Sequence, residues 1–208
     1  MKIMKKEHAN NFINKVLKDG SVESVDSIPG CSIVFKGSDN KITFHEDSRF
    51  NSSLIVVLND NKITLGATSV FRNMTLYSYG SSITIGDRFS CWGLEVRAEE
   101  RGTALSIGND CMFSKGINIY PSDCHTIFDM ETNECINKGG SVVIGDHVWC
   151  GINSFFTKNS KVGSDSIVGA GAFINKAFEE SNVLLVGSPA KIVKSGVNWS
   201  RKSPSEYV

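Results

Sequence analysis

The sequence lacks several features that mark common classes of protein. Its 22 basic and 22 acidic residues cancel, so no overall charge draws the chain toward nucleic acid or an anionic membrane. No stretch reaches the roughly eighteen apolar residues of a membrane span, and residues 1–20 lack the apolar core of a signal peptide. These absences predict a cytoplasmic protein with no nucleic-acid partner and no membrane span.

Metal and nucleotide motifs are also missing. The six cysteines include no CxxC pair, which argues against a zinc site and against a disulfide framework. The chain has neither a Walker loop nor a GxGxxG motif, so nucleotide hydrolysis and dinucleotide binding are not supported. We therefore expect no metal, and we expect reduced thiols that are mostly buried.

What the sequence does contain is a six-residue repeat. Apolar residues recur at this spacing at Ile144, Cys150, Phe156, Val162, Val168 and Ile174. Small or β-branched residues form a second register at Val148, Ser154, Ser160, Ser166 and Ala172. A helix repeats at about 3.6 residues and an ordinary strand at about 2, so this period indicates short strands that turn corners around a shared axis. The pattern predicts a β-solenoid.

The repeat continues upstream with longer steps. Three hexads make a triangular turn of 18 residues, the step from Ile144 to Val162. Matching apolar residues occur earlier at Phe44, Leu65, Ile85 and Ile107. The steps from Phe44 through to Ile144 are 21, 20, 22 and 37 residues, so the last step contains a turn plus an insertion, placed at residues 121–141.

Both ends of a solenoid need a cap. Four apolar residues near the start would share one face of a helix, namely Phe12, Ile13, Val16 and Leu17. The alternative for this segment is a disordered, charged terminus. We expect a helical cap over 1–20, the β-helix with its insertion over 21–180, and a closing strand, turn and tail over 181–208.

Three segments carry a resemblance to a known family. They are IGDHVWCG at 144–151, the periodic stretch that ends at Lys176, and VGSPAKIVK at 186–194. Together they resemble the hexapeptide-repeat acyltransferases, and this resemblance implies an all-β, left-handed parallel β-helix. SDCHTIFD at 122–129 and the tail GSPAKIVKSGVNWSRK are most similar to the bacterial O-acetyltransferases of capsular polysaccharides, including the polysialic acid enzymes. The likeness covers roughly residues 105–202 at the level of motifs.

The resemblance implies transfer of an acetyl group from acetyl-coenzyme A to a sugar hydroxyl of a polysaccharide, with sialic acid as one candidate. Such a transfer needs a base for the hydroxyl proton, and histidine suits that role. His125 is the histidine in the insertion, where a catalytic side chain does not disturb the regular turns, and the family resemblance also places the base there. The alternative is a solvated bystander.

Other residues are candidates to assist the base. The resemblance places Trp149 beside it, where the indole can donate a hydrogen bond or exclude water; a contact between subunits is the alternative. Asp123 or Asp129 is a candidate to orient the imidazole, unless both are exposed loop charges. We discount Cys124 as a nucleophile, because neighbours on an extended chain point to opposite sides and direct transfer needs no covalent intermediate.

The resemblance also implies a site for coenzyme A. Its residues would be Gly151, Gly169, Asn175, Lys176 and Lys191. Glycines allow close approach of the backbone, the lysines would meet phosphate, and the Gly151 N–H is a candidate donor to the reacting carbonyl oxygen. The alternative is that the glycines only allow the backbone to turn a corner and that the lysines are solvated. A single three-sided solenoid offers no cleft for both the coenzyme and the sugar. We therefore expect the homotrimer of the resembling family, in which one chain contributes the base to a site between subunits.

The acceptor should be a carbohydrate or glycan that lies along residues 85–120 and the insertion, and Trp92, Glu95 and Arg97 are eligible to line its groove. A sialic acid polymer would need a cation for its carboxylate, which Arg97 or a lysine of a partner chain would supply. One alternative is an acetyltransferase of a free sugar, a nucleotide-sugar amine or an antibiotic. Another is a noncatalytic solenoid, either structural or related to γ-type carbonic anhydrases. A zinc-using relative needs three histidines at a seam between subunits, whereas only His125 and His147 fall in the later turns.

Overall fold

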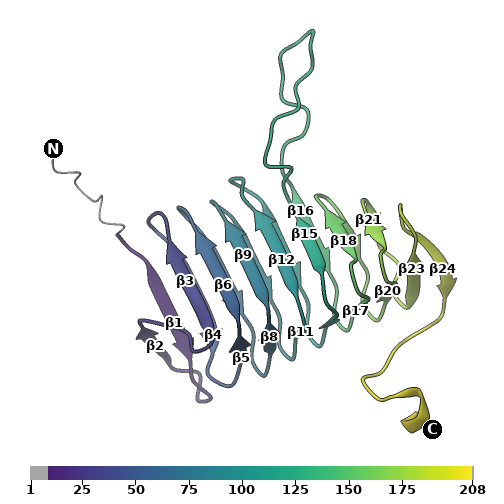
Figure 1. Ribbon diagram of the computed structural model, residues 1–208, viewed down its shortest axis with the longest axis horizontal. Coiled ribbons are helices and arrows are strands. Elements are labelled where there is room, and N and C mark those ends of the chain that lie inside the picture. Colours follow the sequence, from purple (N-terminus) through teal and green to yellow (C-terminus); the bar gives the residue numbers. More distant parts are fainter. Residues whose placement is uncertain (1–8, 208) are drawn as a thin grey trace.

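The computed structural model describes residues 9–207, which wind into a parallel β-helix of about seven turns (Figure 1). Three sheets form the faces of a prism, and each turn visits them in the order A, C, B. We name the corners AC, CB and BA after the sheets that the chain leaves and enters. A short 3₁₀ helix, η1 (Pro204–Glu206), lies near the end of the chain.

Within each sheet the strands of successive turns lie side by side along the axis of the prism. Sheet A contains, in spatial order, β2 (Val22–Val25), β1 (Phe12–Val16), β4 (Lys41–His45), β7 (Lys62–Leu65), β10 (Ser82–Ile85), β13 (Ala104–Ile107), β16 (Ser141–Ile144), β19 (Lys161–Val162) and β22 (Ala177–Phe178). Sheet C contains β24 (Lys191–Ser195), β23 (Val183–Val186), β20 (Ile167–Val168), β17 (Trp149–Cys150), β14 (Met112–Phe113), β11 (Ser90–Cys91), β8 (Val70–Arg72) and β5 (Arg49–Asn51). Sheet B contains β21 (Phe173–Ile174), β18 (Phe155–Thr157), β15 (Ile117–Tyr120), β12 (Leu94–Ala98), β9 (Met74–Ser78), β6 (Ser53–Val57) and β3 (Cys31–Phe35).

The predicted apolar column lies inside the prism. All six of its residues from Ile144 to Ile174 are buried, and the second register from Val148 to Ala172 is buried at the corners. Upstream, Phe44 pairs with Leu65 in sheet A, and the same register continues through the next three turns to Ile144. The β-solenoid predicted from the repeat is therefore confirmed.

A ladder of phenylalanines fills the upstream interior. The rings of Phe44, Phe50, Phe71, Phe89 and Phe113 follow one another with centroid separations of 4.8 to 6.0 Å. Aromatic pairs at these distances stabilise a core beyond the area that they bury. Phe44 and Phe50 belong to one turn, whereas Phe50, Phe71, Phe89 and Phe113 come from four successive turns, so their contacts stabilise adjacent turns.

The first turn differs from the helical cap expected for residues 1–20. Phe12–Val16 is strand β1, which pairs with β4 in parallel and with β2 in an antiparallel hairpin. The physical reason is the edge of sheet A, whose backbone groups a strand can pair and a helix cannot. Ile13 is 5% exposed and faces the core, whereas Phe12 is 51% exposed. Residues 1–8 lie outside the described residues, and the solenoid begins before residue 21.

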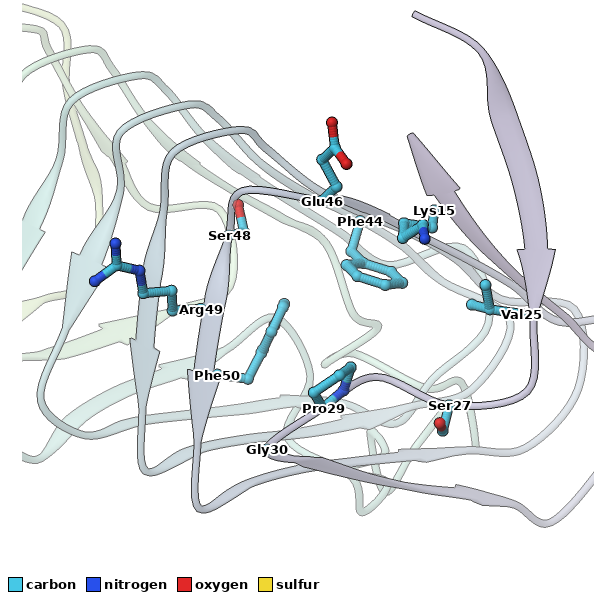
Figure 2. A pocket seen from close by; sticks show the side chains of 10 residues that line it. All are labelled: Lys15, Val25, Ser27, Pro29, Gly30, Phe44, Glu46, Ser48, Arg49 and Phe50. Atoms are coloured by element: carbon cyan, nitrogen blue, oxygen red, sulfur yellow. The ribbon is translucent and has the colours of Figure 1, made fainter. Parts of the chain in front are cut away.

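A hollow of about 590 Å³ lies at this end, between the β2 segment and the first full turn (Figure 2). Figure 2 shows Phe44, Phe50 and Pro29 around it, with Arg49 and Glu46 pointing away. Several turns separate the hollow from the insertion that carries His125 (Figure 1). It therefore plays no part in the chemistry considered below.

The other end closes with β24, which pairs antiparallel with β23. The tail that follows β24 then runs back along the AC corner, where Val197 bonds to Asn182, Asn198 to Asp165 and Trp199 to His147. The Arg201 guanidinium donates to the Ser90 hydroxyl at 2.9 Å and to the Asp110 carboxylate at 3.2 Å. Residues of this tail line a cavity together with Trp149 on the outer face of sheet C.

Candidate active site

The chain leaves the BA corner between β15 and β16, and residues 121–140 form a hairpin that projects from the prism (Figure 1). Phe128 and Cys135 form an antiparallel bridge within it. The Ile136 N–H donates to the Ile127 carbonyl at 2.9 Å. The insertion therefore has hydrogen-bonded structure of its own and is able to present a side chain at a defined place.

Asn137 holds the backbone beside His125. Its amide nitrogen donates to the His125 carbonyl at 2.8 Å and to the Asp123 carboxylate at 2.9 Å, while its amide oxygen accepts from the Ile127 N–H at 2.7 Å. Lys158 forms an ion pair with Asp123 and donates to the Asn137 carbonyl at 2.7 Å. Sequence reasoning missed Asn137 and Lys158, because nothing in the repeat shows which polar residues close the base of a loop.

His125 lines a cavity of about 240 Å³. The other residues that line it are Glu99, Glu100, Cys124, Thr126, Cys135, Asn137 and Lys138. Glu100 accepts from the Ser122 hydroxyl at 2.8 Å and from the Gly139 N–H at 2.9 Å, so it anchors the insertion to the solenoid. Glu99 is paired with Arg97 at 3.2 Å.

Neither aspartate proposed to orient the imidazole contacts it. The hydrogen bond from Lys158 lowers the pKa of Asp123, and backbone N–H groups of Thr132 and Glu131 lower the pKa of Asp129. Both carboxylates therefore stabilise the insertion itself. Within residues 9–207 no hydrogen bond reaches the His125 ring.

Cys124 lies beside His125, contrary to the expectation that the two side chains point apart. The backbone at Cys124 is left-handed, with φ of 61°, not extended, and both residues line the same cavity. Burial and the nearby Glu99 charge raise the pKa of the Cys124 thiol. A protonated thiol is a poor nucleophile, so the raised pKa is the stronger argument against covalent catalysis. All six cysteines are free, and three of them are buried.

Trp149 begins β17 on the outer face of sheet C and is 39% exposed. The Trp199 ring in the tail is 6.3 Å from it, centroid to centroid. Trp149 lines two cavities, one of about 570 Å³ shared with Trp199 and one of about 480 Å³ shared with Arg201. The indole thus lies where a ligand on sheet C would touch it.

His147 has a structural role. Its ring stacks on Trp199 with centroids 4.3 Å apart, and its Nδ1 lies 3.0 Å from the Asp110 carboxylate. Its Nε2 lies 3.2 Å from the Trp199 carbonyl oxygen. The ring therefore attaches the tail to the AC corner.

One chain does not bring His125 and Trp149 together. The insertion leaves the BA corner, which joins sheets B and A, whereas Trp149 lies on sheet C. In a three-sided prism that corner is the one sheet C does not touch. A single chain therefore does not form one site from both residues.

Two predicted coenzyme residues, Gly151 and Gly169, lie on successive turns of the CB corner. A Cβ on Gly151 would lie 2.7 Å from the Ala170 nitrogen, and one on Gly169 would lie 2.7 Å from the Val186 side chain, so close stacking alone accounts for both glycines. The Gly151 N–H donates to the Val168 carbonyl at 2.7 Å and is not free to stabilise an oxyanion, which corrects that expectation.

Two backbone donors at the CB corner are free instead. Between residues 9 and 207, the N–H groups of Ile152 and Ala170 donate to no acceptor. The turn before Lys191 reaches the same corner, because the Phe173 N–H donates to the Gly187 carbonyl at 3.0 Å. Lys191 itself begins β24 and is exposed. Backbone donors beside a cation are suitable for amide carbonyls and phosphates.

Asn175 and Lys176 lie elsewhere, at the BA corner between β21 and β22. The Lys176 ammonium is 5.3 Å from the centre of the Phe178 ring. The five predicted coenzyme residues therefore form two groups on different corners, and the group at the BA corner shares that corner with the insertion of His125.

Arg97 is not available as a cation for an acceptor. Its guanidinium donates to Glu95 at 2.8 Å and to Glu99 at 3.2 Å, and it lies over the Tyr77 ring at 4.5 Å. Hydrogen bonds from Arg97 and Tyr120 lower the pKa of Glu95. Glu95 and Glu99 belong to the same turn as Arg97, whereas Tyr77 and Tyr120 come from the neighbouring turns of sheet B, which the sequence could not show.

Two further structural properties bear on function. No three His, Cys, Asp or Glu side chains within the described range gather in a way that could hold a metal ion. In that same part of the chain no helix is long and apolar enough to cross a membrane.

Several known proteins are similar to the chain in sequence, although no protein-family model matches it. A polysialic acid O-acetyltransferase of Neisseria meningitidis is 36% identical over 170 residues, which cover 80% of this chain and 78% of that protein. An enzyme of the same name from Escherichia coli O1:K1 / APEC is 29% identical over 130 residues, which cover 62% of this chain but only 41% of that protein.

Two solved structures share the fold over nearly the whole chain. The polysialic acid O-acetyltransferase OatWY superposes with a TM-score of 0.72 at 28% identity, covering 94% of this chain and 92% of its own. The polySia specific acetyltransferase NeuO has a TM-score of 0.74 at 24% identity, covering 97% and 93%. The left-handed parallel β-helix expected from the motifs is confirmed.

Proposed function

Because this chain belongs to the polysialic acid O-acetyltransferase family of hexapeptide-repeat acyltransferases, we propose that it transfers the acetyl group of acetyl-coenzyme A to a hydroxyl of a sialic acid polymer. The observation that carries the proposal is the hydrogen-bonded insertion, which presents His125 outside an otherwise regular solenoid. We place the reaction in the cytoplasm, where the six free thiols would stay reduced.

In this proposal His125 is the general base. Its imidazole removes the proton of the sugar hydroxyl as the oxygen attacks the thioester carbonyl carbon. The bond from that carbon to sulfur breaks, and the imidazolium returns its proton to the departing thiolate. Charge and protons balance without a covalent enzyme intermediate, which agrees with the raised pKa of the Cys124 thiol.

The CB corner fits the coenzyme. The free N–H groups of Ile152 and Ala170 would donate to its amide or acetyl carbonyl oxygens, and Lys191 would meet phosphate. Trp149 on the adjoining sheet C would exclude water from the thioester. Asn175 and Lys176 would come from the BA corner of a second chain.

We propose a homotrimer with one active site at each seam. Four apolar side chains of the projecting insertion are between 50% and 86% exposed, namely Ile127, Phe128, Met130 and Ile136, and a neighbouring chain would cover them. Threefold packing would carry His125 of one chain to Trp149 of the next. The two separate groups of predicted coenzyme residues would then face one another across the seam.

Subunit mixing tests both the base and the seam. We expect His125→Ala to lower the turnover number by at least about a hundredfold, the usual contribution of a general base, without loss of the trimer. Mixed in equal amounts with Trp149→Ala chains and reassembled, it should recover about a quarter of the wild-type rate, because one seam of each mixed trimer is intact. A near-normal rate for His125→Ala would refute the base, and mixing without recovery would refute a site shared between chains.

A further inference from the structure

The CB corner carries an exposed tryptophan upstream of Gly151. Trp92 lies between β11 and β12 and is 61% exposed. The Arg72 guanidinium lies 4.7 Å from the centre of its ring. Lys115 occupies the same corner one turn later, and its side chain packs close to Gly93, 3.4 Å from where a Cβ on that glycine would lie.

Neither of the two cations beside Trp92 is paired with a carboxylate in the described part of the chain. Among the ion pairs of residues 9–207, none involves Arg72 or Lys115. Arg97 and Arg201, by contrast, are each bound to carboxylates. The corner therefore combines an exposed aromatic surface with two positive charges that no described side chain neutralises.

Trp92 also separates two hollows. One, of about 480 Å³ on sheet C, is lined by Trp92, Arg72 and Trp149. The other, of about 450 Å³ on sheet B, is lined by Trp92, Lys115 and Asn118. Trp92 and Trp149 are two turns apart, roughly 10 Å at the spacing of neighbouring strands. A ligand on Trp92 would thus extend toward Trp149 on one side and onto sheet B on the other.

We propose that Trp92, Arg72 and Lys115 bind the acceptor as a polymer of carboxylate-bearing sugars. This inference rests on the proposed function, because it assigns the acceptor surface of the same site. The apolar face of one sugar ring packs on the indole, Arg72 binds that sugar's carboxylate, and Lys115 binds the carboxylate of the next sugar. The chain then continues along sheet C, which brings another sugar to Trp149.

A polymer fits this surface better than a small acceptor does. The two hollows lie on different faces of the prism, so an acceptor that fills both must be longer than one sugar. A neutral glycan could accept hydrogen bonds from Arg72 and Lys115 but would lack the charge attraction that a carboxylate adds. Length and charge of the acceptor should therefore both affect binding.

Direct binding tests the surface apart from the chemistry. Sialic acid oligomers of defined length, and the same oligomers with their carboxylates converted to amides, are titrated into the wild-type trimer and into Trp92→Ala, Arg72→Ala and Lys115→Ala. We expect each substitution to raise the dissociation constant of the acidic oligomers about tenfold, while the amides bind weakly to all. Added salt should weaken only the binding of acidic oligomers.

Matched controls are Lys62→Ala, which removes an exposed cation from sheet A, and Phe12→Ala, which removes a half-exposed aromatic from β1. Both should bind as the wild type does. Equal binding of acidic and amidated oligomers, or unchanged affinity in the three variants, would overturn the proposal. Dissociation of the Trp92→Ala trimer would also overturn it, since Trp92 would then be a contact between subunits.

Kinetics separates this inference from the proposed function. With polymer as acceptor, the three variants should show a KM for the polymer raised about tenfold, with kcat and the KM for acetyl-coenzyme A within about twofold of wild type. If the wild type binds acidic oligomers through these residues but never acetylates them, the proposed function fails and the binding surface stands. If it acetylates them with unchanged KM in every variant, the binding surface fails alone.

Discussion

Turns before the insertion take 20 to 22 residues between matched positions, whereas the step from Ile144 to Val162 after it takes 18. Before the insertion the strands of sheet B are four or five residues long, and after it they have two or three. The core-facing residues of sheet C are Phe50, Phe71, Cys91 and Phe113 before the insertion and Cys150, Val168 and Leu185 after it, so the phenylalanines occur only upstream. A longer perimeter encloses larger side chains, so turn length and residue size change together.

The two regions also divide the tasks of the protein. The upstream turns hold the phenylalanine ladder and, in our proposal, the acceptor surface around Trp92. The insertion and the downstream turns hold His125, Trp149 and the residues proposed to bind coenzyme. Most strands there have only two or three residues, and in our proposal the CB corner, with its glycines and free N–H groups, binds the coenzyme.

The largest expected effect concerns the upstream core. Phe71→Ala removes a buried ring that stacks 4.8 Å from Phe50, and it should lower the free energy of unfolding by about 3–5 kcal/mol. Val168→Ala, on the same sheet downstream, removes fewer buried carbons and should cost about 2 kcal/mol. Urea unfolding followed by circular dichroism at one protein concentration measures both. Equal losses of unfolding free energy in the two variants would mean that the phenylalanine ladder does not stabilise the upstream core more than the smaller side chains stabilise the downstream core.

The second effect concerns the insertion. Asn137→Ala removes the hydrogen bonds that hold the backbone of His125, so kcat should fall about ten- to a hundredfold through misplacement of the base. The free energy of unfolding should change by no more than about 0.5 kcal/mol, because this loop is exposed.

Glu131→Gln, at the exposed tip of the same hairpin, is the control for Asn137→Ala and should leave kcat unchanged. If Asn137→Ala keeps the full kcat, the hydrogen bonds at the base of the insertion do not position His125. If it unfolds the protein instead, the insertion belongs to the stable core and the division between the two regions is wrong.

A smaller effect is expected at the downstream end. Lys191→Ala should raise the KM for acetyl-coenzyme A about five- to tenfold and leave kcat near its normal value, because a cation that only holds phosphate contributes equally before and during the reaction. Lys194→Ala, on the same strand, should alter neither constant. An unchanged KM in the Lys191 variant would remove this residue from the coenzyme site.

The smallest effect depends on pH. Lys158 lowers the pKa of Asp123, so their pair stabilises the folded chain above the ordinary aspartate pKa of 3.8 and loses this contribution as the pH falls through the lower folded value. Solvent screens the pair because Asp123 is 41% exposed, so Asp123→Asn should cost about 0.5 kcal/mol at neutral pH. Urea unfolding of both proteins should give curves that converge in acid. A difference that persists there would assign the loss to the altered hydrogen bonds instead.

The period of six residues predicted most of the solenoid, including the pairing of Phe44 with Leu65 and of Ile107 with Ile144. The prediction failed near the start of the chain. The spacing of apolar residues there suited a helix, but the segment forms strand β1, because a strand pairs with the open edge of sheet A. The hairpin contacts of Asn137 and the pairing of Arg97 with Glu95 had no signal in the repeat, since both depend on side chains that meet outside the core.

By itself the sequence determined which side chains face the axis, because the spacing of apolar residues survives changes in the length of individual corners. Only the tertiary structure decided on which corner or face each functional residue lies, since that depends on where every extra residue of the longer turns is accommodated. This is why His125 and Trp149, 24 positions apart in the chain, lie on parts of the prism that do not meet.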